Sequence, residues 1–267
     1  MKWQRTHRTF ALLAAALFVV VVPSLAHSWD DCDGWEENQD WGSKGRYCET
    51  RQLTLAATGF IAVDAGHNGG VRVQGADRSD IALEARIQVW HRSEDKAMAI
   101  AEKIEILTDR NRVKADGPSD EGWAVSYRLR VPRQTDLDLE AHNGGISIAE
   151  VTGQLRAETH NGGLSLIALA GDVQAETTNG GVHVELAGDR WDGRGMDVET
   201  RNGGVKVSIP EGYSAELETG TVNGRVNIDF PVTVQGQIGR DIETTLGSGG
   251  APIRIKTRNG GVTISRH

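Results

Sequence analysis

A short motif, Asn-Gly-Gly, recurs between pairs of alternating segments and constrains the fold of this chain more than any other feature. The stretch AETHNGGLSL (157–166) is typical, and close copies of it read EAHNGGISI, AETTNGGVHV, VETRNGGVKV and IKTRNGGVTI. With an early copy and a degenerate Asn-Gly-Arg copy, the asparagines are Asn68, Asn143, Asn161, Asn179, Asn202, Asn223 and Asn259. From Asn143 onward the copies are about 20 residues apart, with one longer gap before the last, and such self-similarity is typical of a solenoid.

Asn-Gly between alternating strands is also the strongest short signal for a β-hairpin. The direction of the side chains fits both folds, since a turn at Asn179 would pair the inward residues Thr177 and Val182. Burial separates them, because stacked hairpins leave a whole apolar face uncovered, whereas a solenoid coil closes on itself across a thin core. We therefore predict a mostly β fold: residues 136–267 form a β-solenoid like a single-stranded β-helix, with a meander or sandwich as the alternative.

We interpret the motif as a corner of the coil. A sharp corner favours residues that reach a positive φ at low cost, as glycine and asparagine do. Stacked coils also bring equivalent residues to within about 4.8 Å, where a bulky side chain would collide. The seven asparagines are then expected to form a structural turn ladder, with their amides hydrogen-bonded from coil to coil.

The segment before the repeats, residues 51–135, reads as a β part with one helix that is continuous with the solenoid. Residues 81–90, 105–114 and 123–131 are expected strands, because apolar and polar residues alternate in them. Ser93 is expected to cap a helix whose first turn is acidic and whose apolar face includes Ala97, Ile100 and Ala101.

Residues 1–26 have the organisation of a signal peptide. Basic residues precede an apolar run of 13 residues (10–22), and small residues follow at a plausible cleavage site. The run is short for a membrane span, which needs about 20 residues, although an uncleaved anchor is the alternative. No second apolar run occurs. We expect an exported, periplasmic or secreted protein whose mature chain has no transmembrane span.

Residues 27–50 are rich in tryptophan and acidic residues and contain both cysteines of the chain, Cys32 and Cys48. An even pair in an exported protein usually forms a disulfide, so we expect a disulfide-stapled cap. Two further interpretations stay open: the carboxylates bind calcium, or the aromatic rings of Trp35 and Trp41 stack on sugars. The calcium-loop pattern is one ligand short here.

Few residues suggest chemistry. His142 and His160 would stack on adjacent coils, but the next copies carry Thr and Arg at that position, so a metal is not expected. Trp191, in a longer loop, is a further binding candidate. Outward acids recur at Glu140, Glu158, Glu176 and Glu199. No nucleophile, metalloprotease or phosphate-loop motif occurs; no catalytic residue, metal or cofactor is therefore expected, and a net charge of −8 argues against nucleic acid as a partner.

Taken in order, residues 81–131, the step Val131-Pro132, the repeated coils and the closing TRNGGVTIS resemble a family of exported bacterial putative adhesins, a domain of unknown function. The resemblance covers roughly residues 50–267, and RYCETR (46–51) is similar to members with a cysteine-stapled start. It implies a β-helix-like fold and a non-enzymatic role in adhesion or envelope interaction, with an envelope protein or glycan as partner. The alternatives are a structural or stress-related periplasmic protein without a ligand and a polysaccharide-active enzyme.

Overall fold

The computed structural model of the chain describes residues 46–231 and 240–267. These residues form one helix, α1 (Glu94–Ala101), and twenty strands. The strands are β1 (Arg46–Ala56), β2 (Phe60–Asp64), β3 (Val71–Ala76), β4 (Asp80–Trp90), β5 (Glu105–Asp109), β6 (Arg112–Asp116), β7 (Trp123–Pro132), β8 (Asp136–Ala141), β9 (Ile146–Ala149), β10 (Thr152–Thr159), β11 (Leu164–Ile167), β12 (Ala170–Asn179), β13 (Val182–Glu185), β14 (Gly195–Asn202), β15 (Val205–Ile209), β16 (Ala215–Asn223), β17 (Val226–Ile228), β18 (Asp241–Leu246), β19 (Pro252–Asn259) and β20 (Val262–Arg266). Within the described residues, no helix is both long and apolar enough to cross a membrane.

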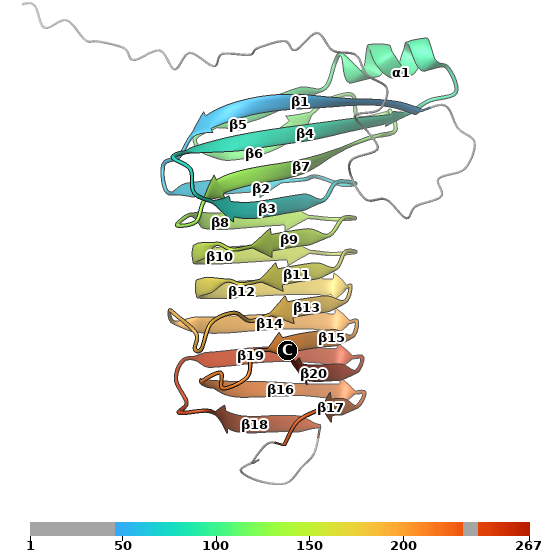
Figure 1. Cartoon of the computed structure of the whole chain (residues 1–267). Helices are drawn as coiled ribbons and strands as arrows, with labels where there is room; N and C mark the ends of the chain where they lie inside the picture. The colour runs from blue at the N-terminus through green and yellow to red at the C-terminus, as the bar shows by residue number, and fades with distance from the viewer. Residues whose placement is uncertain (1–45, 232–239) are drawn as a thin grey trace, which may run out of the picture.

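The strands form two ten-stranded sheets that face each other along an elongated molecule (Figure 1). Each coil gives one long strand to the first face and one short strand to the other, and neighbouring coils pair in parallel, as β10 does with β12 and β11 with β13. The two strands flanking an Asn-Gly-Gly therefore lie in different sheets rather than pairing with each other. The predicted mostly β solenoid is confirmed, and the hairpin alternative is wrong.

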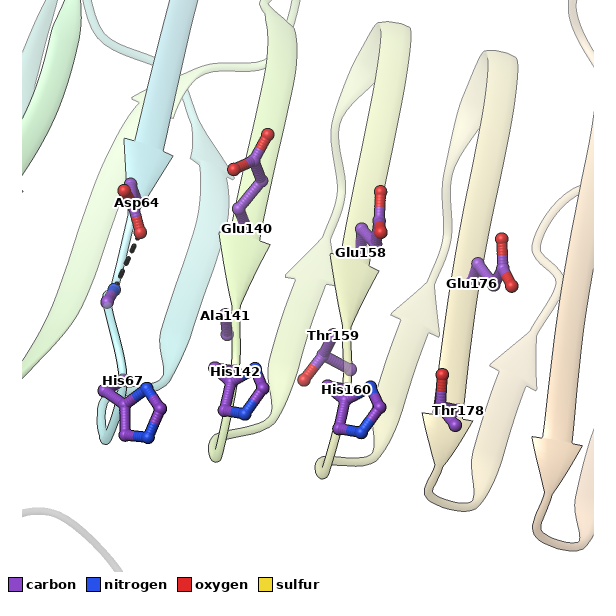
Figure 2. Close-up of a pocket in the computed structure, with 11 residues that line it drawn as sticks. Asp64, His67, Glu140, Ala141, His142, Glu158, Thr159, His160, Glu176 and Thr178 are labelled. Atoms are coloured by element: carbon purple, nitrogen blue, oxygen red, sulfur yellow. Dashed lines mark hydrogen bonds between the residues drawn. The ribbon is translucent and has the colours of Figure 1, made fainter.

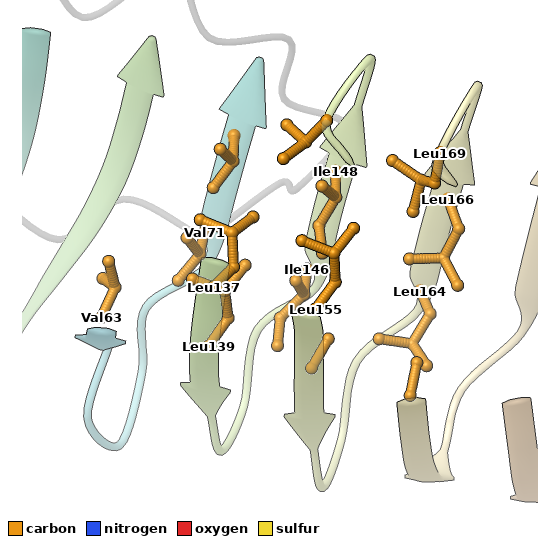
Figure 3. Packing of buried hydrophobic residues seen from close by; sticks show 14 of the residues in the cluster. Val63, Val71, Leu137, Leu139, Ile146, Ile148, Leu155, Leu164, Leu166 and Leu169 are labelled. Carbon is orange, nitrogen blue, oxygen red and sulfur yellow. The ribbon is translucent and has the colours of Figure 1, made fainter. Parts of the chain in front are cut away.

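The core is a thin layer of aliphatic side chains between the sheets (Figure 3). Register is kept from coil to coil, so Leu155 lies beside Leu137 on one side and Val173 on the other. Across the layer, Leu164 and Leu166 come from the opposite sheet and are almost completely buried. Each such side chain contributes about 1.5–3 kcal/mol relative to exposure. The alternation of the sequence therefore accounts directly for the core.

The last coil does not lie at the end of the stack. The sequence order places the coil of β16 and β17 directly after that of β14 and β15, but β19 pairs with β14 on one side and β16 on the other. Likewise β20 lies between β15 and β17 (Figure 1). The degenerate copy, which precedes the last copy in the sequence, therefore lies beyond it in the stack. The chain leaves an open slot and fills it with its C-terminal residues.

The N-terminal end of the stack is closed by longer antiparallel strands. β1, β4 and β7 extend one sheet, the β5–β6 hairpin extends the other, and α1 packs at that end. The guanidinium of Arg51 donates to two carbonyl oxygens at the C-terminal end of α1, that of Ala101 at 2.9 Å and that of Ile104. Ser93 makes no side-chain capping bond, contrary to expectation. The predicted strand at 105–114 is two strands, since Arg110 and Asn111 turn with positive φ.

Candidate functional site

The Asn-Gly-Gly corners stack into one continuous edge of the molecule. Each asparagine donates its side-chain Nδ2 to the Oδ1 of the asparagine in the adjacent coil, at 2.7–3.1 Å. All these bonds run in the same direction, toward the N-terminal end. The order along the edge is Asn68, Asn143, Asn161, Asn179, Asn202, Asn259 and Asn223, which follows the inserted last coil.

Buried threonines hold the same edge from the inside. Thr159 donates its hydroxyl to the carbonyl oxygen of Gly144 at 2.7 Å, and Thr177 does the same to Gly162 at 2.8 Å. Equivalent bonds of 2.8–2.9 Å come from Thr200, Thr221 and Thr257. Each corner is therefore tied to a neighbouring coil both outside and inside the core, which makes the edge a rigid support for the residues beside it.

The corner glycines do not use positive φ, contrary to expectation. In the described chain, Glu150 and Ala168 at the opposite corner of the coil have a positive φ, whereas no residue of the Asn-Gly-Gly motifs does. Close stacking is the reason for the first glycine: a Cβ on Gly162 would lie 2.1 Å from the carbonyl oxygen of Gly144. A Cβ on the second glycine, Gly163, would lie 3.2 Å from its nearest neighbour. The first glycine is required by sterics at every corner, whereas the second is tight at Gly70, at 2.9 Å, and has ordinary contact distances of 3.5–3.6 Å at Gly181, Gly204 and Gly261.

Three histidines, each directly before the asparagine of its motif, stack on one another along the edge (Figure 2). The ring centroids of His67 and His142 are 4.6 Å apart, and those of His142 and His160 are 5.0 Å apart, with the rings close to parallel. All three residues are exposed. Their spacing is that of the coils, so the histidine row follows from the parallel register of the strands that carry them. Thr178 occupies the same position in the next coil.

A row of carboxylates runs beside the histidines on the outer face of the long strands, two residues before the histidine position, or three in the first coil (Figure 2). Asp64, Glu140, Glu158 and Glu176 are in register across β2, β8, β10 and β12. Glu158 is paired with Arg156 at 3.0 Å, and Asp64 accepts from the backbone N–H of Gly66 at 2.8 Å. Glu140 and Glu176 have no hydrogen-bond or ion-pair partner among the described residues.

The two rows line an open groove of about 550 Å³, called here the His–carboxylate groove: Asp64, His67, Glu140, His142, Glu158, His160, Glu176 and Thr178. The parallel rings direct their nitrogens the same way rather than toward one point, and no cluster of three metal ligands occurs in the described parts of the chain. A chelated ion is therefore not what this geometry favours. The groove presents a row of four carboxylates, of which Glu158 is ion-paired and Asp64 is hydrogen-bonded, beside a stack of exposed imidazoles.

The other candidate residues lie elsewhere. Trp191 is only 5% exposed and donates its indole N–H to the carbonyl of Gly171 at 3.0 Å, so it packs on the core and offers no surface to a ligand. Trp35, Trp41 and Cys32 lie outside the described residues. Cys48 lies near the start of strand β1 and is not a free cysteine. Its pairing with Cys32 stays a prediction.

Sequence reasoning missed the part of the groove that precedes the repeats. His67 and Asp64 come from the coil of β2 and β3, whose Asn68 is separated from the next asparagine by 75 residues. The signal was present, because His67-Asn68-Gly69-Gly70 matches His142-Asn143-Gly144-Gly145 letter for letter. The predicted ladder includes Asn68, but the sequence does not say which coil this residue lies against.

Comparison with known proteins identifies the fold family. A search of curated proteins finds no match. Solved structures that resemble the chain include "a putative cell adhesion protein" from Clostridium sporogenes, at 12% identity over 83% of this chain and 100% of that one, with a TM-score of 0.45. Another is "a putative adhesin" from Bacteroides fragilis, at 12% identity over 83% and 97%, with a TM-score of 0.34. Residues 132–265, half of the chain, match the Toastrack DUF4097 domain, and the chain belongs to that family.

Proposed function

We propose that this protein is an exported, non-catalytic binding protein that holds a cationic group of an envelope protein or glycan in the His–carboxylate groove. The observation that carries the proposal is the row of four carboxylates kept in register, of which Glu140 and Glu176 have no partner in the described chain. Like charges about 4.8 Å apart repel one another. A row of this kind is favourable when an ammonium or guanidinium group is bound against it.

The neighbouring imidazoles suit the same ligand. Because the three exposed rings stack on one another, they present a row of ring edges whose nitrogens can hydrogen-bond a hydroxyl or guanidinium group, and only the two ends of the stack offer an open ring face. The groove extends across several coils, so an elongated partner meets the same chemistry repeatedly. Export is supported by the predicted signal peptide at residues 1–26.

A hydrolytic role has less support in the geometry. Glycoside hydrolysis needs one carboxyl group as acid and another as nucleophile or base, set apart by different surroundings. The groove instead repeats one residue type at equivalent, exposed positions, Glu140, Glu158 and Glu176. Polysaccharide cleavage that is present in the purified protein and disappears in Glu158→Gln/Glu176→Gln would replace the binding proposal with an enzymatic one.

The experiment compares ligand binding by the unmodified protein, by a groove variant that lacks two carboxylates, and by a control variant that lacks one carboxylate elsewhere. The purified protein is applied to a glycan array that includes polymers with free amino groups, and is used to capture envelope proteins. We expect Glu140→Gln/Glu176→Gln to lose most of the binding, and salt to weaken binding by the unmodified protein, because exposed charges are screened. Glu243→Gln, an exposed acid on β18 away from the groove, is the control and should bind normally.

Two results would overturn the proposal. Equal binding by the groove variant and the control would place the ligand elsewhere on the solenoid. Absence of binding to both glycans and envelope proteins would favour the structural or stress-related role without a ligand.

A further inference from the structure

We infer that Asn223 is a site of spontaneous chemical modification, deamidation to aspartate and isoaspartate, and that the asparagine ladder suppresses the same reaction at the interior corners. Every ladder asparagine is followed by glycine, and an Asn-Gly pair is prone to this reaction because glycine has no Cβ to hinder attack by its backbone nitrogen. The structure separates these chemically similar pairs by their surroundings.

The reaction needs only water. The backbone nitrogen of Gly224 attacks Cγ of Asn223, the Cγ–Nδ2 bond breaks, and ammonia leaves with the proton released by the Gly224 nitrogen. The five-membered succinimide that forms is then opened by water at either carbonyl, which gives aspartate or isoaspartate. Both the side-chain amide and the following backbone N–H must move to react, so hydrogen bonds on either one slow the reaction.

Interior asparagines are held on both sides. Asn161 donates its Nδ2 to Asn143 and accepts on Oδ1 from Asn179, each at 2.8 Å. Asn179, Asn202 and Asn259 have a further restraint, since the glycine N–H that would attack donates to a backbone carbonyl of the adjacent coil. These three corners should be the slowest of the ladder.

Asn223 lies at the open end. Its Nδ2 donates to Asn259 at 2.7 Å, but its Oδ1 accepts no hydrogen bond in the described chain. Its neighbours Val222, Gly224 and Arg225 are all exposed, whereas the first glycines of the interior corners are partly buried. The antiparallel strand β18 pairs with β16 as far as Gly220, and Arg240 extends this contact to Thr221 and to the carbonyl of Val222, but no described residue of this segment bonds to Asn223 or Gly224.

The opposite end of the ladder is closed. Asn68 donates its Nδ2 to no acceptor in the described chain, but Gly69 is buried whereas Gly224 is exposed. The backbone of both glycines lies against a carbonyl oxygen, of Val125 and of Gly260, so exposure is what distinguishes the two ends. Within the described residues, the Asn223 end is the exposed end and is the one expected to react.

The test is peptide mapping by mass spectrometry after the purified protein is incubated at mildly alkaline pH. We expect Asn223 to convert about fivefold or more faster than Asn161, the factor that one additional hydrogen bond supplies. In urea, where the ladder is lost, the seven rates should converge. Equal or faster conversion at Asn161 in the folded protein would overturn the inference, as would an unchanged ranking in urea.

Arg225→Gly is the matched variant, because it gives Asn223 the same following sequence as the interior corners. If position in the ladder decides the rate, Asn223 stays the fastest site in this variant. A fall of the Asn223 rate to that of Asn161 would show that Arg225 sets the reactivity and would reject the structural explanation. Circular dichroism before incubation verifies that the variant is folded.

Discussion

At the scale of single residues, the two glycines of each motif have different roles. A side chain on the first meets backbone atoms of the adjacent coil, which cannot move without breaking the stack. A side chain on the second meets nothing closer than ordinary contact distance at Gly181, Gly204 and Gly261, and Arg225 occupies this position in the degenerate copy. The second glycine leaves bare backbone on the surface, and Gly181, Gly204 and Gly261 line an open groove of about 500 Å³.

This difference predicts opposite outcomes for adjacent substitutions. Gly180→Ala should destabilise the protein by about 3 kcal/mol, since overpacking against backbone is costly and its Cβ would lie 1.9 Å from the carbonyl oxygen of Gly162. Gly181→Ala should change the free energy of unfolding by less than about 1 kcal/mol, because its nearest contact is 3.5 Å away and alanine restricts the unfolded chain. Denaturant unfolding of both variants measures the two values. Similar losses in the pair would contradict the steric explanation.

Burial raises the pKa of three tyrosines, Tyr47, Tyr127 and Tyr213, and Tyr127 is the one whose titration should matter most for stability. It is completely buried in β7, its hydroxyl has no acceptor among the described residues, and burial, followed by the charge of Asp64, raises the pKa of the hydroxyl well above its ordinary range. A raised folded-state pKa means that the stabilisation is complete below the unfolded value of about 10 and is lost as pH rises above it.

Replacing Tyr127 with phenylalanine should therefore flatten the loss of stability in alkali. At neutral pH the Tyr127→Phe variant should be at least as stable as the natural protein, since an unsatisfied buried hydroxyl costs about 1–3 kcal/mol. Urea unfolding at pH 7 and at roughly pH 11 tests both points. An alkaline loss that is as large in the variant as in the natural protein would rule out Tyr127 as its source.

At the scale of the coil, the asparagine corner should contribute more to the free energy of unfolding than the charged outer face. Asn161→Val removes two amide hydrogen bonds at 2.8 Å and should cost about 1–3 kcal/mol. Glu158→Gln removes an exposed pair with Arg156 and should change stability by no more than about 0.5 kcal/mol. The comparison of melting temperatures decides; equal values would mean that the amide ladder does not stabilise the solenoid.

Much of a coil could be predicted from its own sequence. The inward residues are correct because alternation assigns every second side chain to the core, as with Leu155, Ala157 and Thr159. The carboxylates of the groove follow from the same alignment. The prediction of positive φ at the Asn-Gly-Gly corners was wrong. Glycine tolerates both a positive φ and close stacking, and the sequence alone does not show which of these two properties a corner requires.

At the scale of the whole molecule, the inserted C-terminal coil links the end of the stack to the rest. Among the strand pairings of the described residues, β16 and β17 reach the body of the solenoid through β19 and β20. Removing residues 251–267 should therefore expose the backbone amides of β16 and β17 although these residues remain in the chain.

Hydrogen exchange measured by mass spectrometry tests this dependence. We expect protection to be lost in β16 and β17 and retained in β10 to β13, which are separated from the missing coil by at least one other. Unchanged protection in β16 would mean that β16 pairs with another strand, such as β14, when β19 is missing. Loss across the entire solenoid would mean that the coils fold as one unit rather than as neighbours.

The sequence by itself determined the repeating unit: alternation chose the core residues, and the repeat length chose the parallel register that aligns asparagines, histidines and carboxylates. Both are local properties, because each coil must bury its own apolar side chains. Only the tertiary structure decided which coils are neighbours. It placed the last coil between two earlier ones and brought His67 beside His142. Nothing local encodes these choices, since parallel coils with matching inward residues are nearly interchangeable as partners until the whole chain is paired.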